Sequence, residues 1–146
     1  VEFNNNFESV IMNCAMAKRS DQDDTWITDE IIGHYIDLHK TGHAYSAETY
    51  KIIDGKKSLV GGVYGVCISN FVSGESMYYK EDNASKLALY TLLTKLNDNG
   101  VHWIDTQMVT PVISNLGGKE ISRKSFLQKI EAADIRKRII PKFFNN

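Results

Sequence analysis

The chain has 146 residues, a length that fits one domain with a sizeable buried core. Its composition, 42% hydrophobic and 24% charged with only two prolines, is typical of a globular protein. The net charge is −1, no apolar run approaches the ~20 residues of a membrane span, and no signal leader is visible. We therefore expect a single-domain cytoplasmic protein in which Cys14 and Cys67 are reduced.

Charge is distributed unevenly along this sequence. Residues 119–146 carry eight Lys/Arg against three Asp/Glu, whereas the preceding part of the chain is acidic. A basic segment on an acidic body can meet a phosphate backbone. It can equally be the solvated face of a C-terminal helix, and the composition leaves both interpretations open.

The first two predicted elements are helices. Residues 5–18 repeat apolar side chains at helical spacing and begin with Asn at the candidate cap position. Thr28 can cap a second helix over 29–40, in which apolar residues again recur every three or four positions. Gly42 closes this helix.

From residue 43 the period changes from helical to alternating. Alternation predicts a strand over 44–52, and a tight Asp-Gly turn leads from it into a second strand over 58–69. A third strand is predicted over 71–79. Three glycines in the second strand mark either a bend of the sheet or a place where another group approaches the backbone closely; they are Gly61, Gly62 and Gly65.

The second half of the chain completes the expected fold. Asn83 can cap a helix over 84–97 with a broad apolar face. A fourth strand, 101–109, is expected to run parallel to the third, because a strand–helix–strand crossover demands it. Residues 111–118 are predicted as a loop with one helical turn, and 123–131 as a last helix. The order predicts an α/β fold with a mixed sheet and helices on its faces.

Conventional catalytic motifs are weak in this sequence. His39 and His43 have the i, i+4 spacing of paired metal ligands, but a glycine breaks the helix between them and no third ligand has an obvious place, so no metal is expected. Ser76 lacks the second glycine of a nucleophile elbow and an activating His. Glu81 and Asp82, just before the third helix, would repel a pyrophosphate, which argues against a nucleotide or coenzyme A site there.

Three polar features remain as candidates for chemistry. Asp105 and Gln107 are two positions apart on the predicted fourth strand, so both side chains should point to one face. Glu75 is the only acid in the third predicted strand. Trp26 lies at an element boundary, where it is either a core anchor or an exposed aromatic that stacks on a base.

Seven short motifs occur in a recognisable order and at recognisable gaps. They are Thr25-Trp26-Ile27-Thr28, Gly42-His43-Ala44-Tyr45-Ser46-Ala47-Glu48, Leu59-Val60-Gly61-Gly62-Val63-Tyr64-Gly65-Val66, Gly74-Glu75-Ser76-Met77, Asn83-Ala84-Ser85-Lys86, Ile104-Asp105-Thr106-Gln107 and Leu116-Gly117-Gly118-Lys119-Glu120-Ile121. Together they closely resemble the leucyl/phenylalanyl-tRNA–protein transferase family over residues 7–130. The resemblance implies a GNAT-like acyltransferase fold that uses aminoacyl-tRNA as co-substrate in place of acetyl-CoA, with no other cofactor.

The resemblance also implies an activity and partners. Members of this family transfer Leu or Phe from the 3′ end of aminoacyl-tRNA to the N-terminal Arg or Lys of a protein, which marks that protein for degradation under the N-end rule. We therefore expect an aminoacyltransferase that binds the tRNA 3′ end and such an acceptor, acts as a monomer and does not bind a membrane.

Site residues follow from the same resemblance. Gln107 is expected to contact the attacking amine, while Asp105 orients Gln107 and supplies negative charge. Glu75 is expected to meet the cationic side chain of the acceptor, and Trp26 to stack on the terminal adenosine. The family's apolar pocket for the transferred side chain maps onto five aliphatic residues: Val63, Val72, Leu89, Leu92 and Ile104.

Some of these assignments have a simpler alternative. Leu89 and Leu92 fit plain core packing as well as a pocket, since both environments are apolar. If the pocket assignment holds, the three glycines of the second strand are best interpreted as making room for the aminoacyl ester.

The sequence also departs from the family pattern. Nothing matches the family's small N-terminal domain, so residues 1–146 are expected to form a single catalytic domain with weakened tRNA binding and low or absent activity. Tyr45 stands where the family often has His, and Thr106 where it often has Cys. Two alternatives are a GNAT-like transferase with another aminoacyl-tRNA or acceptor, and a non-catalytic module that binds an N-terminal residue. The presence of Asp105 and Gln107 favours catalysis.

Overall fold

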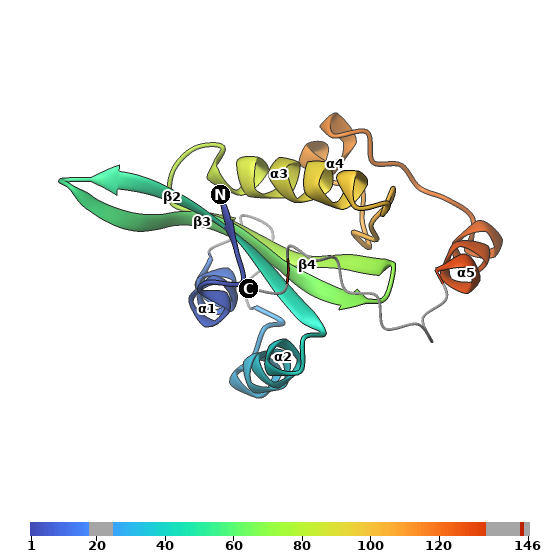
Figure 1. The fold of residues 1–146 in the computed structure, drawn as a ribbon, viewed down its shortest axis with the longest axis horizontal. Helices are drawn as coiled ribbons and strands as arrows, with labels where there is room; N and C mark the ends of the chain where they lie inside the picture. Colours follow the sequence, from blue (N-terminus) through green and yellow to red (C-terminus); the bar gives the residue numbers. More distant parts are fainter. Residues whose placement is uncertain (18–24, 134–143, 145–146) are drawn as a thin grey trace.

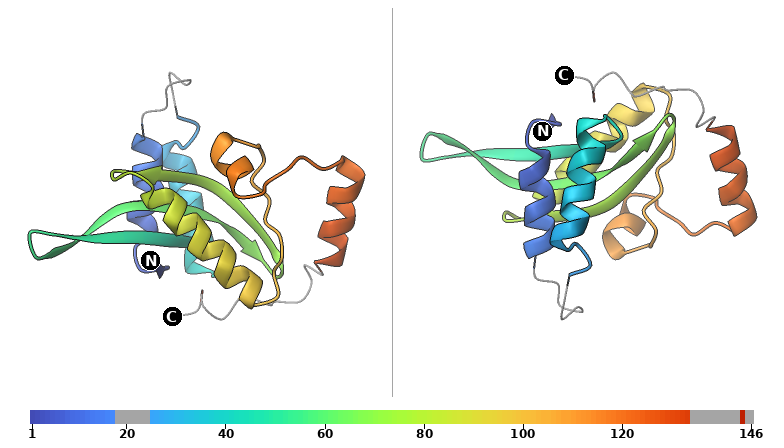
Figure 2. Two further views of the ribbon diagram at one scale, coloured as in Figure 1. Left: turned by 90° about the horizontal axis from the view of Figure 1, so that it is seen from above. Right: turned by 90° about the horizontal axis from the view of Figure 1, so that it is seen from below.

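The computed structural model describes residues 1–17, 25–133 and 144, and its centre is a four-stranded antiparallel sheet (Figure 1). Its strands, in spatial order, are β1 (Glu2–Phe3), β2 (Ala44–Ile53), β3 (Lys56–Ile68) and β4 (Phe71–Tyr79). The helices are α1 (Phe7–Met16), α2 (Asp29–Lys40), α3 (Ala84–Asp98), α4 (Pro111–Asn115) and α5 (Arg123–Ala132). Helices α1 and α2 cover one face of the sheet and α3 covers the other, while α5 stands apart beyond one edge (Figures 1 and 2).

The predicted α/β class is therefore confirmed, and the predicted helices and the first three predicted strands are present within a few residues of the expected bounds. Local chemistry explains this agreement. Thr28 and Ser122 cap α2 and α5 with side-chain acceptors, and Asp54-Gly55 turns the β2–β3 hairpin with both residues at positive φ. The GNAT-like topology stays a prediction.

The predicted parallel strand over 101–109 is wrong. A single parallel bridge joins this segment to β4: the Asp105 N–H donates to the Val72 carbonyl at 2.9 Å, and the Gly74 N–H donates to the Asp105 carbonyl at 2.8 Å. Gln107 then adopts φ +56°, in the left-handed region, which turns the chain out of the extended conformation. The mixed sheet is consequently wrong as well, because every described strand pairs antiparallel.

The sheet separates two apolar cores. Between the sheet and α3, Tyr45 and Val63 pack with Val72, Leu89 and Leu92. The second core fills the space between the sheet and the α1/α2 pair; its buried members are Phe7, Val10, Ile11, Cys14, Ile27, Ala44, Tyr64 and Tyr78. No helix in the described part of the chain is both long and apolar enough to cross a membrane.

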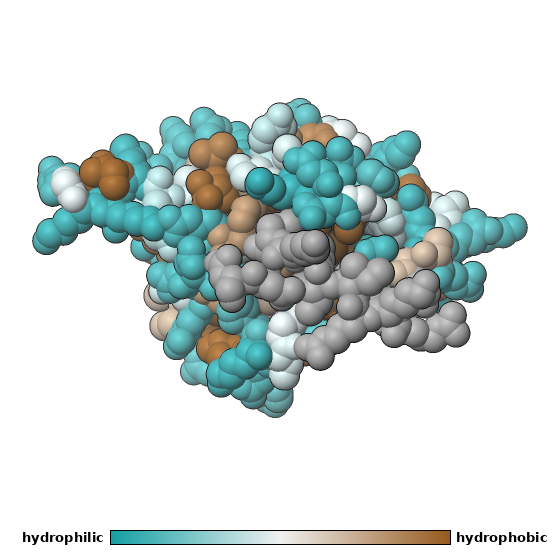
Figure 3. All heavy atoms as spheres, in the orientation of Figure 1, coloured by the Kyte–Doolittle hydropathy of each residue, from teal (hydrophilic) through white to brown (hydrophobic). Residues whose placement is uncertain are grey.

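The β2–β3 hairpin projects beyond the body of the molecule (Figure 1). Its tip carries two exposed apolar side chains, Ile52 and Ile53, on a surface that is otherwise largely hydrophilic on this side (Figure 3). Isolated apolar side chains of this kind are common on protein surfaces, so we assign no role to the tip.

The three glycines of β3 lie against other parts of the protein. A Cβ at Gly61 would lie 2.6 Å from the Ala84 Cβ at the start of α3, and one at Gly65 would lie 1.8 Å from the Ser73 carbonyl oxygen. Gly62 faces α1 in the same way. The interpretation that these glycines make room for an ester is therefore wrong, because the close approach comes from the protein's own backbone and helices.

Gly65 accommodates a β-bulge in β4. Tyr64 pairs with Ser76 and Gly65 pairs with Gly74, which leaves Glu75 as the extra residue of β4. A bulge changes the direction in which the extra side chain points. Glu75, the only acid of β4, therefore does not follow the regular alternation of side chains along the strand. The absence of a side chain at Gly65, on the neighbouring strand, leaves room for this bulge.

Glu48 is a fully buried carboxyl on β2. Burial raises its pKa above the ordinary value, and the Ser46 hydroxyl at 2.6 Å and the Asn6 backbone N–H at 3.2 Å oppose this effect. Since the folded-state pKa is the higher one, this group favours folding below its unfolded-state pKa, and its contribution is lost as the pH rises through the folded-state pKa.

Replacing Glu48 by Gln is expected to remove this pH dependence. The free energy of unfolding of the natural protein should fall relative to that of Glu48→Gln as the pH rises from about the ordinary value of 4.5 towards 8. Urea unfolding at several pH values measures the difference. Glu8→Gln, at an exposed position on α1, is the control, and a Glu48→Gln difference that does not change with pH would contradict the assignment.

Candidate functional site

A cavity of about 580 Å³ lies where β3, β4, α3 and the segment after Asp105 meet. Five of the residues predicted for the site line it, although they come from distant parts of the sequence. They are Trp26, Val63, Glu75, Leu89 and Gln107. The wall also contains Met77, Met108 and Ile113, so one side is apolar while Glu75 and Gln107 make the other polar.

The remaining predicted residues lie close by but outside this cavity's lining. Val72 and Leu92 are fully buried in the core between the sheet and α3. Ile104 packs against the same core, and with Asp105 it lines a neighbouring cavity. Trp26 is 40% exposed, so its ring is accessible at the mouth of the first cavity rather than anchored in the core.

Two further side chains hold Glu75 in place. The Ser73 hydroxyl donates to Glu75 Oε1 at 2.6 Å. The Tyr35 hydroxyl, from α2, also interacts with this carboxylate; burial, followed by the nearby Glu75 charge, raises the pKa of Tyr35 to about 12. Tyr35 therefore stays neutral next to the Glu75 carboxylate. Nothing in the sequence indicated this pairing, because α2 and β4 are about forty residues apart.

The bulge that carries Glu75 is itself fixed by a buried hydrogen bond. The Tyr45 hydroxyl donates to the Ser73 carbonyl at 2.9 Å, on the side where Gly65 has no side chain. Burial raises the pKa of Tyr45, which keeps this hydroxyl protonated. Tyr45, which departs from the family pattern, thus supports the site through the backbone next to Glu75.

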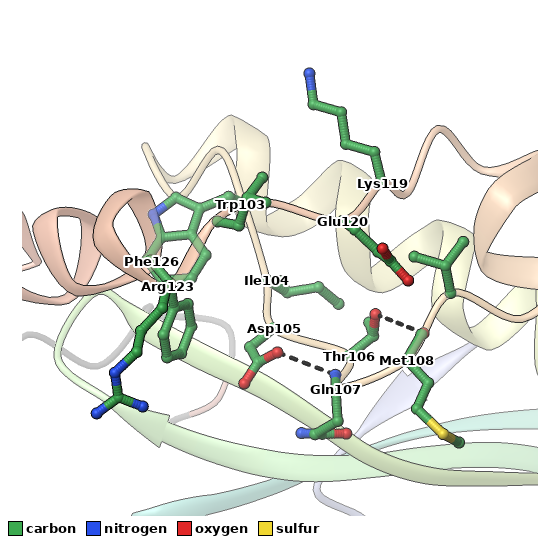
Figure 4. Close-up of a pocket in the computed structure, with 12 residues that line it drawn as sticks. Trp103, Ile104, Asp105, Thr106, Gln107, Met108, Lys119, Glu120, Arg123 and Phe126 are labelled. Carbon is green, nitrogen blue, oxygen red and sulfur yellow. Dashed lines mark hydrogen bonds between the residues drawn. The ribbon is translucent and has the colours of Figure 1, made fainter.

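The side chain of Asp105 is hydrogen-bonded to the backbone of Gln107. The Gln107 N–H donates to Asp105 Oδ1 at 3.0 Å, which closes a tight turn (Figure 4). The side chain of Gln107 faces the Gly74 and Thr106 carbonyl oxygens, so its amide is assigned the orientation in which Nε2 donates to them, at 2.9 and 3.1 Å. The prediction that the two side chains share one face of a strand is therefore wrong. Residues 105–107 form a turn in which the Asp105 side chain contacts the Gln107 backbone.

This arrangement has a chemical consequence. With Nε2 engaged, Oε1 of Gln107 is left as a hydrogen-bond acceptor for a substrate N–H. The Gly74 N–H donates to the Asp105 carbonyl, and the Gly74 carbonyl accepts from the Gln107 amide. Glu75 is the next residue of the chain. The Glu75 carboxylate and Oε1 of Gln107 are therefore two acceptors in one cavity, which suits recognition of an amine.

A second cavity, of about 570 Å³, adjoins the first. The two share the wall formed by residues 106–108. In Figure 4, Trp103, Phe126 and Arg123 lie together on one side of this second cavity, Lys119 and Glu120 lie on another, and Asp105 lies between them.

The weaker motifs have structural roles. His39 stacks on Phe7 with ring centroids 4.3 Å apart, and its Nδ1 lies 2.9 Å from the Ala44 carbonyl oxygen. In the part of the chain that the structure describes, no three His, Cys, Asp or Glu side chains gather as a metal site. Of the eight cations of the basic C-terminal segment, Arg123, Lys124 and Lys129 lie on α5 and Lys119 precedes it. The other four, Arg136, Lys137, Arg138 and Lys142, lie outside the described residues.

Comparison with known proteins adds independent information. Residues 1–131 match the profile of a protein family described as leucyl/phenylalanyl-tRNA protein transferase. A relative of that name from Burkholderia vietnamiensis is 44% identical over 133 residues, which is 91% of this chain and 51% of the relative.

Two further relatives carry the same name. The protein from Hydrogenovibrio crunogenus is 43% identical over 142 residues, 97% of this chain and 54% of its own length. The protein from Sulfurimonas denitrificans is 44% identical over 133 residues, 91% of this chain and 57% of its own length. The chain spans about half the length of the curated relatives it matches.

Proposed function

The chain belongs to the leucyl/phenylalanyl-tRNA–protein transferase family, as its seven motifs predicted, and on this premise we propose that it transfers Leu or Phe from aminoacyl-tRNA to the N-terminal Arg or Lys of a protein. The observation that supports this function most directly is the first cavity. It combines an apolar wall, a carboxylate and the Asp105–Gln107 turn around one point of β4.

The apolar wall suits the transferred side chain. Val63, Leu89 and Met77 offer a surface on which Leu or Phe is favoured and a charged side chain is disfavoured by desolvation. Trp26, exposed at the mouth, offers a face on which the terminal adenosine of the tRNA stacks. The ester that links the two then lies beside the turn.

The reaction forms an amide and breaks an ester. The acceptor's α-amine nitrogen bonds to the ester carbonyl carbon, and the bond from that carbon to the ribose oxygen breaks. The nitrogen loses one proton and the ribose oxygen gains one, so the ribose leaves with a free hydroxyl. Oε1 of Gln107 accepts an N–H of the amine and directs its lone pair. The Asp105 carboxylate, tied to the Gln107 backbone, stabilises the positive charge that develops on the nitrogen.

Glu75 makes the reaction selective for acceptors with an N-terminal Arg or Lys. Its carboxylate, held by Ser73 and Tyr35, forms a charge-assisted hydrogen bond with the side chain of an N-terminal Arg or Lys. The rest of the proposal follows from the family: a GNAT-like fold, no cofactor besides aminoacyl-tRNA, a cytoplasmic monomer, and a role in marking proteins for degradation under the N-end rule.

A transfer assay tests this function. The chain is incubated with radiolabelled Leu-tRNA and two peptides that differ only in an N-terminal Arg or Asp, and label is expected in the Arg peptide. Glu75→Gln is expected to lower kcat/KM for the Arg peptide by about 10- to 100-fold, mostly through KM, because a hydrogen bond to a charged group contributes about 1.5–3 kcal/mol.

Glu81→Gln is the matched control, because Glu81 pairs with Lys51 at 2.9 Å and does not line the cavity. An unchanged KM in Glu75→Gln would remove Glu75 from acceptor binding. Binding of the Arg peptide without any transfer by the unmodified chain would favour the non-catalytic binding module instead.

A further inference from the structure

Apart from Asp105 and the shared segment 106–108, the residues of the second cavity have no role in the steps above. The segment 106–108 forms a wall of both cavities, and Asp105 lines only the second. A molecule bound at Gln107 in the first cavity therefore lies next to the second. Whatever continues from the reacting amine is therefore close to the second cavity.

The acceptor polypeptide is the substrate that continues from the reacting amine. In the proposed function, the first cavity takes the aminoacyl group and the side chain of the acceptor's N-terminal residue. The remainder of the acceptor chain must leave the reacting centre in another direction. Two extended residues span about 7 Å, so residues just after the acceptor's N-terminus fall within the neighbouring cavity.

The charges of this second cavity suit a polypeptide better than a nucleic acid. Lys119 and Arg123 stand against Asp105 and Glu120, so the formal charges of its lining balance. A phosphate backbone requires an excess of positive charge. A peptide main chain carries only dipoles, and a lining with both signs can pair with its N–H and C=O groups.

The ring of Trp103 is also engaged by neighbouring side chains. Lys129 Nζ lies 5.2 Å from the centroid of the ring, over its face, and Phe71 and Phe126 meet the ring in edge contacts at 5.8 and 6.4 Å. These contacts pack α5 against the segment that leads to Asp105. Arg123, on the first turn of α5, is thereby held at the edge of the cavity (Figure 4).

Arg123 is the side chain best suited to hold a peptide. Its guanidinium carries five N–H donors in a fixed fork, and no hydrogen bond or ion pair to it occurs among the described residues. A carbonyl oxygen of an extended peptide is an acceptor for such a fork.

We propose that the second cavity is the binding site for the acceptor polypeptide beyond its N-terminal residue, and that Arg123 binds a main-chain carbonyl there. The inference rests on the proposed function. It predicts that acceptor length matters: arginine amide should be a poorer acceptor than an Arg-Ala-Ala-Ala amide by about 10-fold in KM.

The test compares these two acceptors in the natural chain, Arg123→Gln and Lys124→Gln. Arg123→Gln is expected to raise KM for the tetrapeptide by about 5- to 10-fold, to the level of arginine amide, and to leave KM for arginine amide and for Leu-tRNA unchanged. Lys124, the next residue on α5, does not line the cavity, so Lys124→Gln should behave like the natural chain. Because Arg123 is exposed, folding of the variant should be preserved.

The outcomes separate this inference from the proposed function. A KM that does not depend on acceptor length, or an Arg123→Gln variant that raises KM for Leu-tRNA instead, overturns the polypeptide site while the transferase function stands. If no acceptor is labelled, calorimetric titration of the tetrapeptide and arginine amide into the chain without tRNA still decides the inference. Tighter binding of the tetrapeptide that Arg123→Gln abolishes supports it, and equal or absent binding overturns it.

Discussion

Replacing Asp105 by alanine is expected to lower kcat/KM for aminoacyl transfer by about 10²- to 10⁴-fold, the range typical of a group that assists proton transfer. The change removes the acceptor of the Gln107 N–H, which closes the turn at φ +56°, and it removes the negative charge beside the reacting amine. The rate of radiolabelled Leu transfer to an Arg peptide measures the effect.

Asp105→Asn separates the two contributions. An asparagine oxygen can still accept the Gln107 N–H, so the turn should persist while the charge is lost. If the charge assists the reaction, Asp105→Asn should lose at least about 10-fold in rate with little change in thermal stability. Full activity in Asp105→Ala would remove this residue from the mechanism, and full activity in Asp105→Asn would reduce its role to holding the turn.

The second large effect is expected at Gly65. A Cβ at this position would lie 1.8 Å from the Ser73 carbonyl oxygen and 2.7 Å from the Tyr45 hydroxyl, so Gly65→Ala cannot be accommodated without displacing the backbone of the bulge. Overpacking typically costs about 1–3 kcal/mol and occasionally more, and we expect the upper end of this range because backbone must move. Urea unfolding should show this loss in the free energy of unfolding.

Gly33→Ala is the matched control, and its effect should have the opposite sign. Gly33 lies within α2 with no atom within 4 Å of its added Cβ, so alanine should stabilise the protein by about 1 kcal/mol through helix propensity. A Gly65→Ala variant as stable as the natural protein would mean that the bulge is not required by the fold. If the variant retains stability but loses preference for the Arg peptide, the bulge serves Glu75 alone.

The sequence predicted well those features that are set by neighbouring residues. The caps of α2 and α5 depend on one side chain each, Thr28 and Ser122, and the hairpin turn depends on Asp54-Gly55. The change to an alternating pattern at residue 44 likewise predicted β2 from a few successive side chains. For such elements, local propensity and the final fold agree.

The features that the sequence did not predict depend on distant partners. Residues 101–109 are predicted as a strand, but they pair with β4 through one bridge only, because the turn after Asp105 redirects the chain. The glycines of β3 looked like space for a substrate, whereas the space is filled by α1, α3 and the bulge. The support of Glu75 by Tyr35 required knowledge of how α2 packs on the sheet.

The family motifs predicted which residues belong to the site but not how these residues are arranged in space. Trp26, Glu75 and Gln107 come together at one cavity although they lie on three separate segments. The sequence alone could not have placed the second cavity, because Trp103 and Phe126 meet only when α5 folds back beside the segment that carries Asp105.

The single bridge between Asp105 and β4 divides the site into parts of unequal local stability. Glu75 and Val63 lie on strands that pair along most of their length, whereas two backbone hydrogen bonds and the Gln107 amide attach the catalytic turn to Gly74 and its neighbour. Local opening of the turn thus requires far less free energy than global unfolding, and it leaves both cores intact. We therefore expect the amide hydrogens of the turn to exchange faster than those of β3 while the sheet stays closed.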